Sequence, residues 1–124
     1  MDRRQFLAAG VGIGAAAASA SQAFGLMGAA FLDHAVPGVG LTVSGPVREA
    51  RLYFDLGVVA ARVQVMSSTG TVIRASRPFI NSSSQEIVTV RLGRALGPGT
   101  YLVSWDVISV AGWSTSGTFR FTVA

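Results

Sequence analysis

From about residue 31 onward, apolar and polar residues alternate in short segments that are separated by Gly, Pro, Ser and Asn. An alternation with a period of two places every second side chain on the same face of a β-strand. Several such segments at regular spacing are typical of an antiparallel sandwich or barrel. No segment in this part of the chain has a helical period over a comparable length. The pattern predicts about seven strands, at residues 31–32, 47–54, 61–66, 71–74, 86–92, 101–107 and 118–123.

The alternation is clearest in the last third of the chain. Two faces rich in large apolar residues can pack together as a core. Tyr101 directly follows a Gly-Pro-Gly-Thr turn and resembles a tyrosine corner, whose hydroxyl bonds to the backbone at a Greek-key crossing. We therefore expect an all-β fold, a Greek-key sandwich or barrel. The residues predicted to point inward are Tyr101, Val103, Trp105 and Val107 in one strand and Phe119, Phe121 and Val123 in the next.

The first thirty residues follow a different pattern. Arg3 and Arg4 precede Gln5-Phe6-Leu7, and residues 8–20 contain only Ala, Gly, Val, Ile and one Ser. A charged head, an apolar stretch and small residues after it are typical of an export signal. The arginine pair followed by x-Phe-Leu resembles a twin-arginine signal, the type that exports folded proteins.

We expect the signal to cover residues 1–23, with cleavage as late as residue 30 as an alternative, and an exported domain at 29–124. A retained membrane anchor is the weaker alternative, because Ser21-Gln22 interrupts the apolar stretch. After cleavage we expect no direct insertion into a membrane.

Composition narrows the chemistry that the chain can carry. Its 124 residues suffice for one domain, and they include ten Arg, no Lys, one His and no Cys. Disulfides and Cys-ligated metal centres are therefore excluded. The arginines are spread singly along the exported part and form no basic run interleaved with aromatics, so we do not expect binding to nucleic acid. No nucleophile with a base, phosphate-binding loop or paired carboxylates stands out, so we do not expect an enzyme.

The stretch from Leu96 to Val123 resembles the C-terminal half of the copper-resistance protein CopC family. Members of that family end in a similar pattern, L-x-P-G-T-Y-x-V-x-W…S-x-D-G-H-x-x-x-G-x-F-x-F-x-V. Phe31-Leu32, Pro37, Gly40 and residues 51–54 also match the spacing of the family's front motif, so the resemblance spans about residues 29–123.

This resemblance implies a periplasmic sandwich, cupredoxin-like or immunoglobulin-like, that binds copper and works with an inner-membrane partner of the CopD type. Family Cu(II) sites use the N-terminal His of the mature chain and the Asp and His of D-G-H, and some members add a Glu. In this chain those four positions hold Ala29, Ala111, Trp113 and Leu56. None of these side chains offers a lone pair to a cation. We therefore expect a copper-homeostasis family protein with a degenerate site, and copper itself is implied by the resemblance only.

His34 is the one imidazole in the chain and the one candidate metal ligand. Cleavage after Phe31 would give the terminus Leu32-Asp33-His34, in which an amine and the third-position His form a square-planar Cu(II) chelate. A functional copper carrier of this kind is the alternative to the degenerate site. The simpler interpretation is a solvent-facing histidine, because a lone His is seldom a ligand set.

Trp113 has two interpretations that the sequence does not separate. It is a candidate contact for a partner, because Trp is frequent at binding hot spots. It could equally fold over the end of the sandwich and fill the space of the metal site.

Overall fold

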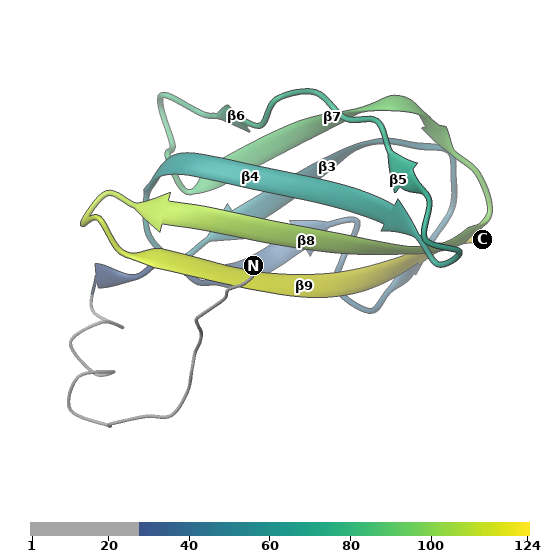
Figure 1. Cartoon of the computed structure of the whole chain (residues 1–124), viewed down its shortest axis with the longest axis horizontal. Coiled ribbons are helices and arrows are strands. Elements are labelled where there is room, and N and C mark those ends of the chain that lie inside the picture. The colour runs from purple at the N-terminus through teal and green to yellow at the C-terminus, as the bar shows by residue number, and fades with distance from the viewer. Residues whose placement is uncertain (1–27) are drawn as a thin grey trace.

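The computed structural model describes residues 28–124, which form two open β-sheets packed face to face (Figure 1). One sheet has the strand order β1-β3-β7-β6 and the other the order β2-β9-β8-β4-β5. The all-β sandwich is confirmed, and the alternative of a closed barrel is wrong. The strands are β1 (Leu32–Val36), β2 (Thr42–Val43), β3 (Val47–Phe54), β4 (Val58–Ser67), β5 (Val72–Ile73), β6 (Phe79–Ile80), β7 (Ile87–Leu96), β8 (Gly99–Ser109) and β9 (Ser114–Val123).

The expected export signal at residues 1–23, with Arg3 and Arg4, lies outside the described residues. Among the residues that the structure does describe, there is no helix with the length and hydropathy needed to cross a bilayer.

The strands of the five-stranded sheet carry the alternation that the sequence predicts. Along β8 the odd positions from Tyr101 to Ser109 are buried, whereas Asp106 and Ile108 are exposed. β8 pairs antiparallel with β4 on one side and with β9 on the other, in register over most of its length. One face of this sheet therefore faces the core and the other faces water.

The core forms where the inward faces of the two sheets meet. Leu52 and Phe54 from β3 pack with Trp105, Phe119 and Phe121 from the other sheet. The rings of Phe54 and Trp105 meet edge to face, with centroids 5.2 Å apart and an interplanar angle of 77°, a favoured geometry for aromatic pairs. The predicted inward positions of the last two strands are all buried.

The strand boundaries differ from the prediction at the short edge strands. Residues 28–124 contain nine strands instead of about seven, because β2 and β6 have two residues each and are too short to show a period. β1 does not end at Leu32 but continues to Val36, paired with β3. A bulge between Leu32 and His34 interrupts the alternation there, which is why the sequence shows no clear strand.

Tyr101 forms the expected bond to the backbone. Its hydroxyl donates a hydrogen bond to the carbonyl oxygen of Gly97 at 2.8 Å, and its ring packs on Phe121 with centroids 5.6 Å apart. The side chain is 7% exposed. The bond therefore fixes the β7–β8 turn to the core.

We predict that Tyr101→Phe lowers the free energy of unfolding by about 1 kcal/mol, because it removes one largely buried hydrogen bond and leaves the ring in place. Urea denaturation measures the change. Tyr53→Phe is the matched control, since this hydroxyl lies on the outer face of β3, and it should cost less. Equal effects of the two substitutions would contradict a special role for the Tyr101 corner.

Candidate functional site at one end of the sandwich

Three chain segments meet at the end of the sandwich where the β8–β9 hairpin lies (Figure 1). They are residues 28–31, the β3–β4 turn at 55–57 and the hairpin at 110–113. The amide of Val110 donates to the carbonyl of Gly57 at 2.9 Å, which joins the turn to the hairpin. The amide of Phe31 donates to the Asp55 carboxylate at 2.8 Å, and the amide of Asp55 donates back to the carbonyl of Phe31 at 3.0 Å.

Ser109 fastens the hairpin to residues 28–30. It is fully buried, and its hydroxyl oxygen accepts hydrogen bonds from the amides of Ala111 and Trp113, each at 3.2 Å. The same hydroxyl donates to the carbonyl of Gly28. The Thr115 hydroxyl donates to the carbonyl of Ala30 in the same way. Because Ala29 and Ala30 are also buried, residues 28–30 are part of the folded domain.

The indole of Trp113 packs directly against Gly28. A methyl group placed on Gly28 would lie 2.5 Å from Cδ1 and 2.6 Å from Nε1 of Trp113, and 3.2 Å from the Cβ of Ala111. Leu56, at the adjoining turn, is half-buried against the core. Residues 28–30, Leu56, Ala111 and Trp113 therefore converge at one end of the sandwich, although they are far apart in the sequence.

The side chains at this end do not fit a Cu(II) site. Alanine and leucine carry no donor atom, and the indole N–H can only donate a hydrogen bond. Within residues 28–124, no three His, Cys, Asp or Glu side chains are grouped closely enough to hold a metal ion. Gly112 has a φ of 88°, so the turn itself requires a glycine whatever the neighbouring residues bind.

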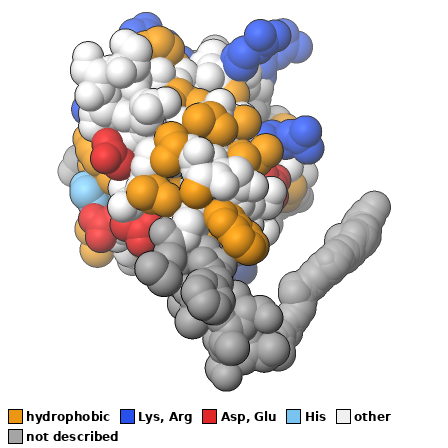
Figure 2. Space-filling model, turned by 90° about the vertical axis from the view of Figure 1, so that its left-hand side faces the viewer, with side chains coloured by type: hydrophobic (Ala, Val, Ile, Leu, Met, Phe, Trp, Pro, Cys, Tyr) orange, Lys and Arg blue, Asp and Glu red, His pale blue; other side chains and the backbone are white. Residues whose placement is uncertain are grey.

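An apolar surface covers this end of the molecule. We call it the Trp113 patch and define it by four side chains at the adjoining ends of β4 and β8 and in the hairpin. Figure 2 looks onto this end and shows apolar side chains gathered there, with acidic side chains beside them. The four residues and their exposed fractions are Val59 (54%), Ile108 (39%), Val110 (50%) and Trp113 (48%).

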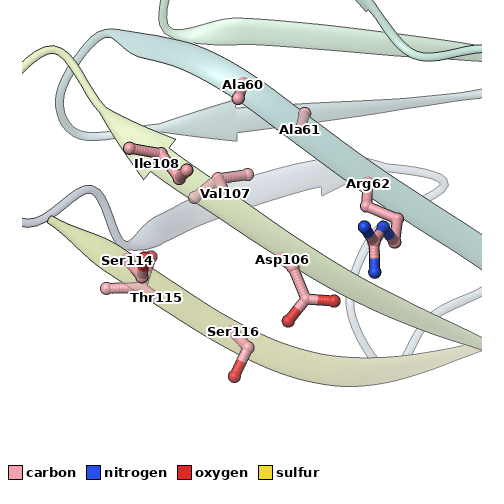
Figure 3. Close-up of a pocket in the computed structure, with 9 residues that line it drawn as sticks. All are labelled: Ala60, Ala61, Arg62, Asp106, Val107, Ile108, Ser114, Thr115 and Ser116. Atoms are coloured by element: carbon pink, nitrogen blue, oxygen red, sulfur yellow. The ribbon is translucent and has the colours of Figure 1, made fainter. Parts of the chain in front are cut away.

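A shallow hollow of about 350 Å³ adjoins the patch on the outer face of β4, β8 and β9. Ile108 belongs both to the patch and to the wall of the hollow. Arg62 and Asp106 lie opposite each other across the β4–β8 strand pair, and their side chains extend from the same face of the sheet (Figure 3). Asp106 is exposed to water. The hollow therefore offers one cation, one carboxylate and the serine and threonine hydroxyls of β9.

His34 lies in β1, on the outer face of the four-stranded sheet. Its ring stacks on Tyr53 with centroids 4.2 Å apart and an interplanar angle of 9°. Its Nδ1 lies 2.7 Å from a carboxylate oxygen of Asp33, and both side chains are more than half exposed. These contacts describe a surface histidine with one acidic neighbour.

The fold matches known proteins of one family. Residues 32–124 match the family model of the CopC domain, and the chain therefore belongs to the CopC-domain family. Protein YobA of Escherichia coli (strain K12) is 30% identical over 96 residues, which cover 76% of this chain and 77% of that protein.

Solved structures agree with the family match. CopC from Methylosinus trichosporium OB3b superposes with a TM-score of 0.71 at 25% identity, over 77% of this chain and 93% of that chain. PcoC, a copper resistance protein from Escherichia coli, has the same fold, with a TM-score of 0.68 at 17% identity over 76% and 99% of the two chains. The resemblance to copper-resistance proteins of the CopC type is thus confirmed.

Ser109, which organises this end, is not among the residues that the sequence pattern singles out. One signal was available: Ser109 continues the inward series of odd positions in β8, where every earlier member is large and apolar. A polar residue at a core position requires hydrogen-bond partners, and these partners are the hairpin amides and Gly28.

We predict that Gly28→Ala displaces the indole of Trp113, because the added methyl occupies the space of the ring. The change should appear as a red shift in tryptophan fluorescence and should disappear in a Trp113→Phe background, where only the buried Trp105 emits. Gly97→Ala is the matched control, since a methyl there meets no atom within 4 Å. Unchanged emission in Gly28→Ala would contradict the packing of the indole on Gly28.

Proposed function

We propose that this protein is an exported, non-enzymatic CopC-domain protein whose Cu(II) site has lost its ligands. It serves copper homeostasis by docking to a partner in or at the inner membrane, of the CopD type, through the Trp113 patch. The observation that carries the proposal is the replacement of the expected ligands by Ala29, Leu56, Ala111 and Trp113 in a frame that is otherwise retained.

Loss of the copper site is supported by the geometry of the end of the sandwich. Cu(II) favours imidazole, amine and carboxylate donors in a tetragonal arrangement. The space around Gly28 is instead occupied by the indole of Trp113 and the methyl of Ala111. A copper ion in this space would require the indole to move and would then find no donor side chain from either residue.

A docking role is supported by the exposure and the anchoring of the same surface. Trp and other apolar side chains that are half exposed on a rigid frame are favoured anchors in protein interfaces. The backbone under Trp113 is fixed by the buried Ser109 hydroxyl, so little ordering would be needed on binding. The Trp113 patch thus combines the two properties that a contact surface requires.

The alternative, a copper carrier that uses His34 and a new amino terminus, is less well supported. A chelate with His at the third position takes nitrogen donors from the backbone of residues 32–34. These residues lie in β1 and pair with β3, so the chelate would have to withdraw this backbone from the sheet. His34 is also occupied by Asp33 and by the ring of Tyr53.

We predict that titration of the protein starting at residue 24 with Cu(II), against a competing chelator, shows no tight one-to-one site. Ala111→Asp combined with Trp113→His should raise the Cu(II) affinity by about tenfold or more, because it returns a carboxylate and an imidazole to the hairpin. Ala111→Asn with Trp113→Phe is the matched control and should bind no better than the unchanged protein. Sub-nanomolar binding by the unchanged protein would refute the loss of the site, and its abolition by His34→Ala would establish the carrier.

We predict that Trp113→Ala weakens binding to a co-expressed CopD-type membrane protein by about 30-fold, the effect of removing a hot-spot residue. Val110→Ser, which removes a second apolar side chain of the patch, should also weaken this binding. Val39→Ser, at a similarly exposed valine in the β1–β2 loop, is the control and should have no effect. The measurement is the dissociation constant of each variant for the purified membrane protein in detergent. Equal affinity of Trp113→Ala and the unchanged protein would refute docking through the patch.

A further inference from the structure

The charges of the folded chain are separated, although the arginines are spread singly along the sequence. Eight arginines lie in the described residues, and six of them lie on β3, on β7 or in the segment between β5 and β6. Glu49 is the one acidic residue in these same segments, whereas Asp33 lies in β1 of the same sheet, Asp55 and Glu86 lie just outside β3 and β7, and Asp106 lies in the other sheet. We call the six residues the arginine face: Arg48, Arg51, Arg74, Arg77, Arg91 and Arg94.

Strand register brings the middle of this face together. In β3 the buried residues Ala50 and Leu52 alternate with Glu49 and Arg51, which therefore point to the outer side of the sheet. Glu49 is the direct partner of Arg91 in β7, so Arg91 points to the same side.

Hydrogen bonds bring the segment between β5 and β6 against β7. The amide of Ser76 donates to the carbonyl of Arg91 at 2.8 Å, and the amide of Arg91 donates to the Ser76 hydroxyl at 3.0 Å. The amide of Gly93 donates to the carbonyl of Arg74 at 2.6 Å, and a methyl on Gly93 would lie only 3.0 Å from that carbonyl oxygen. The small size of Gly93 thus permits the close approach that places Arg74 and Arg77 beside β7.

Most of the positive charge on this face is not neutralised within the described part of the chain. The Arg51 guanidinium donates to the Glu49 carboxylate at 2.7 Å. Hydrogen bonds to Tyr53 and to Glu49 raise the pKa of Arg51 above its ordinary value. The other five arginines of the face form no ion pair with any residue among 28–124.

An exposed aromatic ring lies within the same face. Phe79, in the edge strand β6, is the direct partner of Thr89 in β7 and is 62% exposed, the highest value among the exposed large apolar residues of the described chain. Thr89 is in turn the partner of Arg51 in β3. Phe79 is therefore on the outer side of the sheet, separated from Arg51 by the one intervening strand β7, and it follows Arg77 by two residues.

We propose that the arginine face and Phe79 bind the surface of a bilayer that contains anionic phospholipids. A guanidinium forms two parallel hydrogen bonds to a phosphate and is only weakly hydrated. A basic surface with an exposed aromatic ring suits the headgroup region, where the ring enters the interface and the cations remain at the phosphates. A broad sheet face on which five of six arginines have no ion-pair partner among residues 28–124 suits a diffuse anionic surface better than an acidic protein, which would have to place one carboxylate at each arginine.

This inference does not rest on the proposed docking function. The arginine face lies along β3, β7 and the segment between β5 and β6, whereas the Trp113 patch lies at one end of the sandwich. A protein held on a bilayer by this face would keep the Trp113 patch free for lateral contact with a membrane protein.

The test is co-sedimentation of the protein with protein-free vesicles of phosphatidylcholine alone or with one quarter phosphatidylglycerol, at low and at high salt. We expect binding only to the anionic vesicles and its loss at high salt, because surface charges are then screened. Each arginine at an anionic surface contributes a factor of about five to the affinity. Arg77→Gln combined with Arg91→Gln should therefore weaken binding about 25-fold. Arg62→Gln combined with Arg120→Gln removes the same charge from the other sheet and should have little effect.

Phe79→Ser removes the exposed ring and leaves the charges of the face unchanged. It should therefore weaken vesicle binding without changing the dependence of binding on salt. Equal loss in the two arginine pairs would overturn the proposal, because binding would then follow net charge alone. Failure of the unchanged protein to bind anionic vesicles at low salt would also overturn it. Binding to native inner-membrane vesicles but not to protein-free vesicles of equal charge would assign the face to an acidic protein instead.

Discussion

One buried hydroxyl, that of Ser109, holds together the end of the sandwich that carries the Trp113 patch. It occupies a core position of β8 and satisfies two hairpin amides and the carbonyl of Gly28 at once. A polar group in such a position costs free energy unless it is fully bonded. The hairpin and the segment that precedes β1 are therefore coupled, and neither can shift without breaking bonds of the other. Everything placed on this frame, above all Trp113, takes its position from that coupling.

The hydrogen bonds of Ser109 hold the backbone at this end without any metal ligand. In this chain the segments at this end converge through backbone and hydroxyl bonds, which need no metal ion. Ala111 and Trp113 can therefore stand in the hairpin without loss of its geometry, and Gly112 keeps the turn through its positive φ. The indole on Gly28 then gives the end an apolar surface. In this chain the frame therefore carries an exposed indole and an exposed valine in the hairpin.

The sequence was informative where the physical signal is local and periodic, and silent where it is not. The inward residues of β8 and β9, the core role of Trp105 and the bond of Tyr101 follow from alternation and from one turn. The two-residue strands β2 and β6 have no period, and the bulge near His34 hides the extent of β1. Ser109 was missed because its partners are distant in sequence. The arginine face was missed because single arginines become neighbours only through the register of β3 with β7 and the bonds of Ser76.

The burial of Ala29 and Ala30 has a consequence for the maturation of the chain. A signal peptidase must bind its substrate as an extended, accessible strand of backbone. In the folded domain the peptide bonds that follow Ala29 and Ala30 lie inside the protein, and the carbonyl of Ala30 is held by Thr115. If the chain crosses the membrane already folded, as a twin-arginine leader would imply, the expected cleavage after residue 23 leaves these bonds intact, whereas cleavage after residue 30 would first require this end of the domain to open. Folding before transport would in this way favour the upstream cleavage.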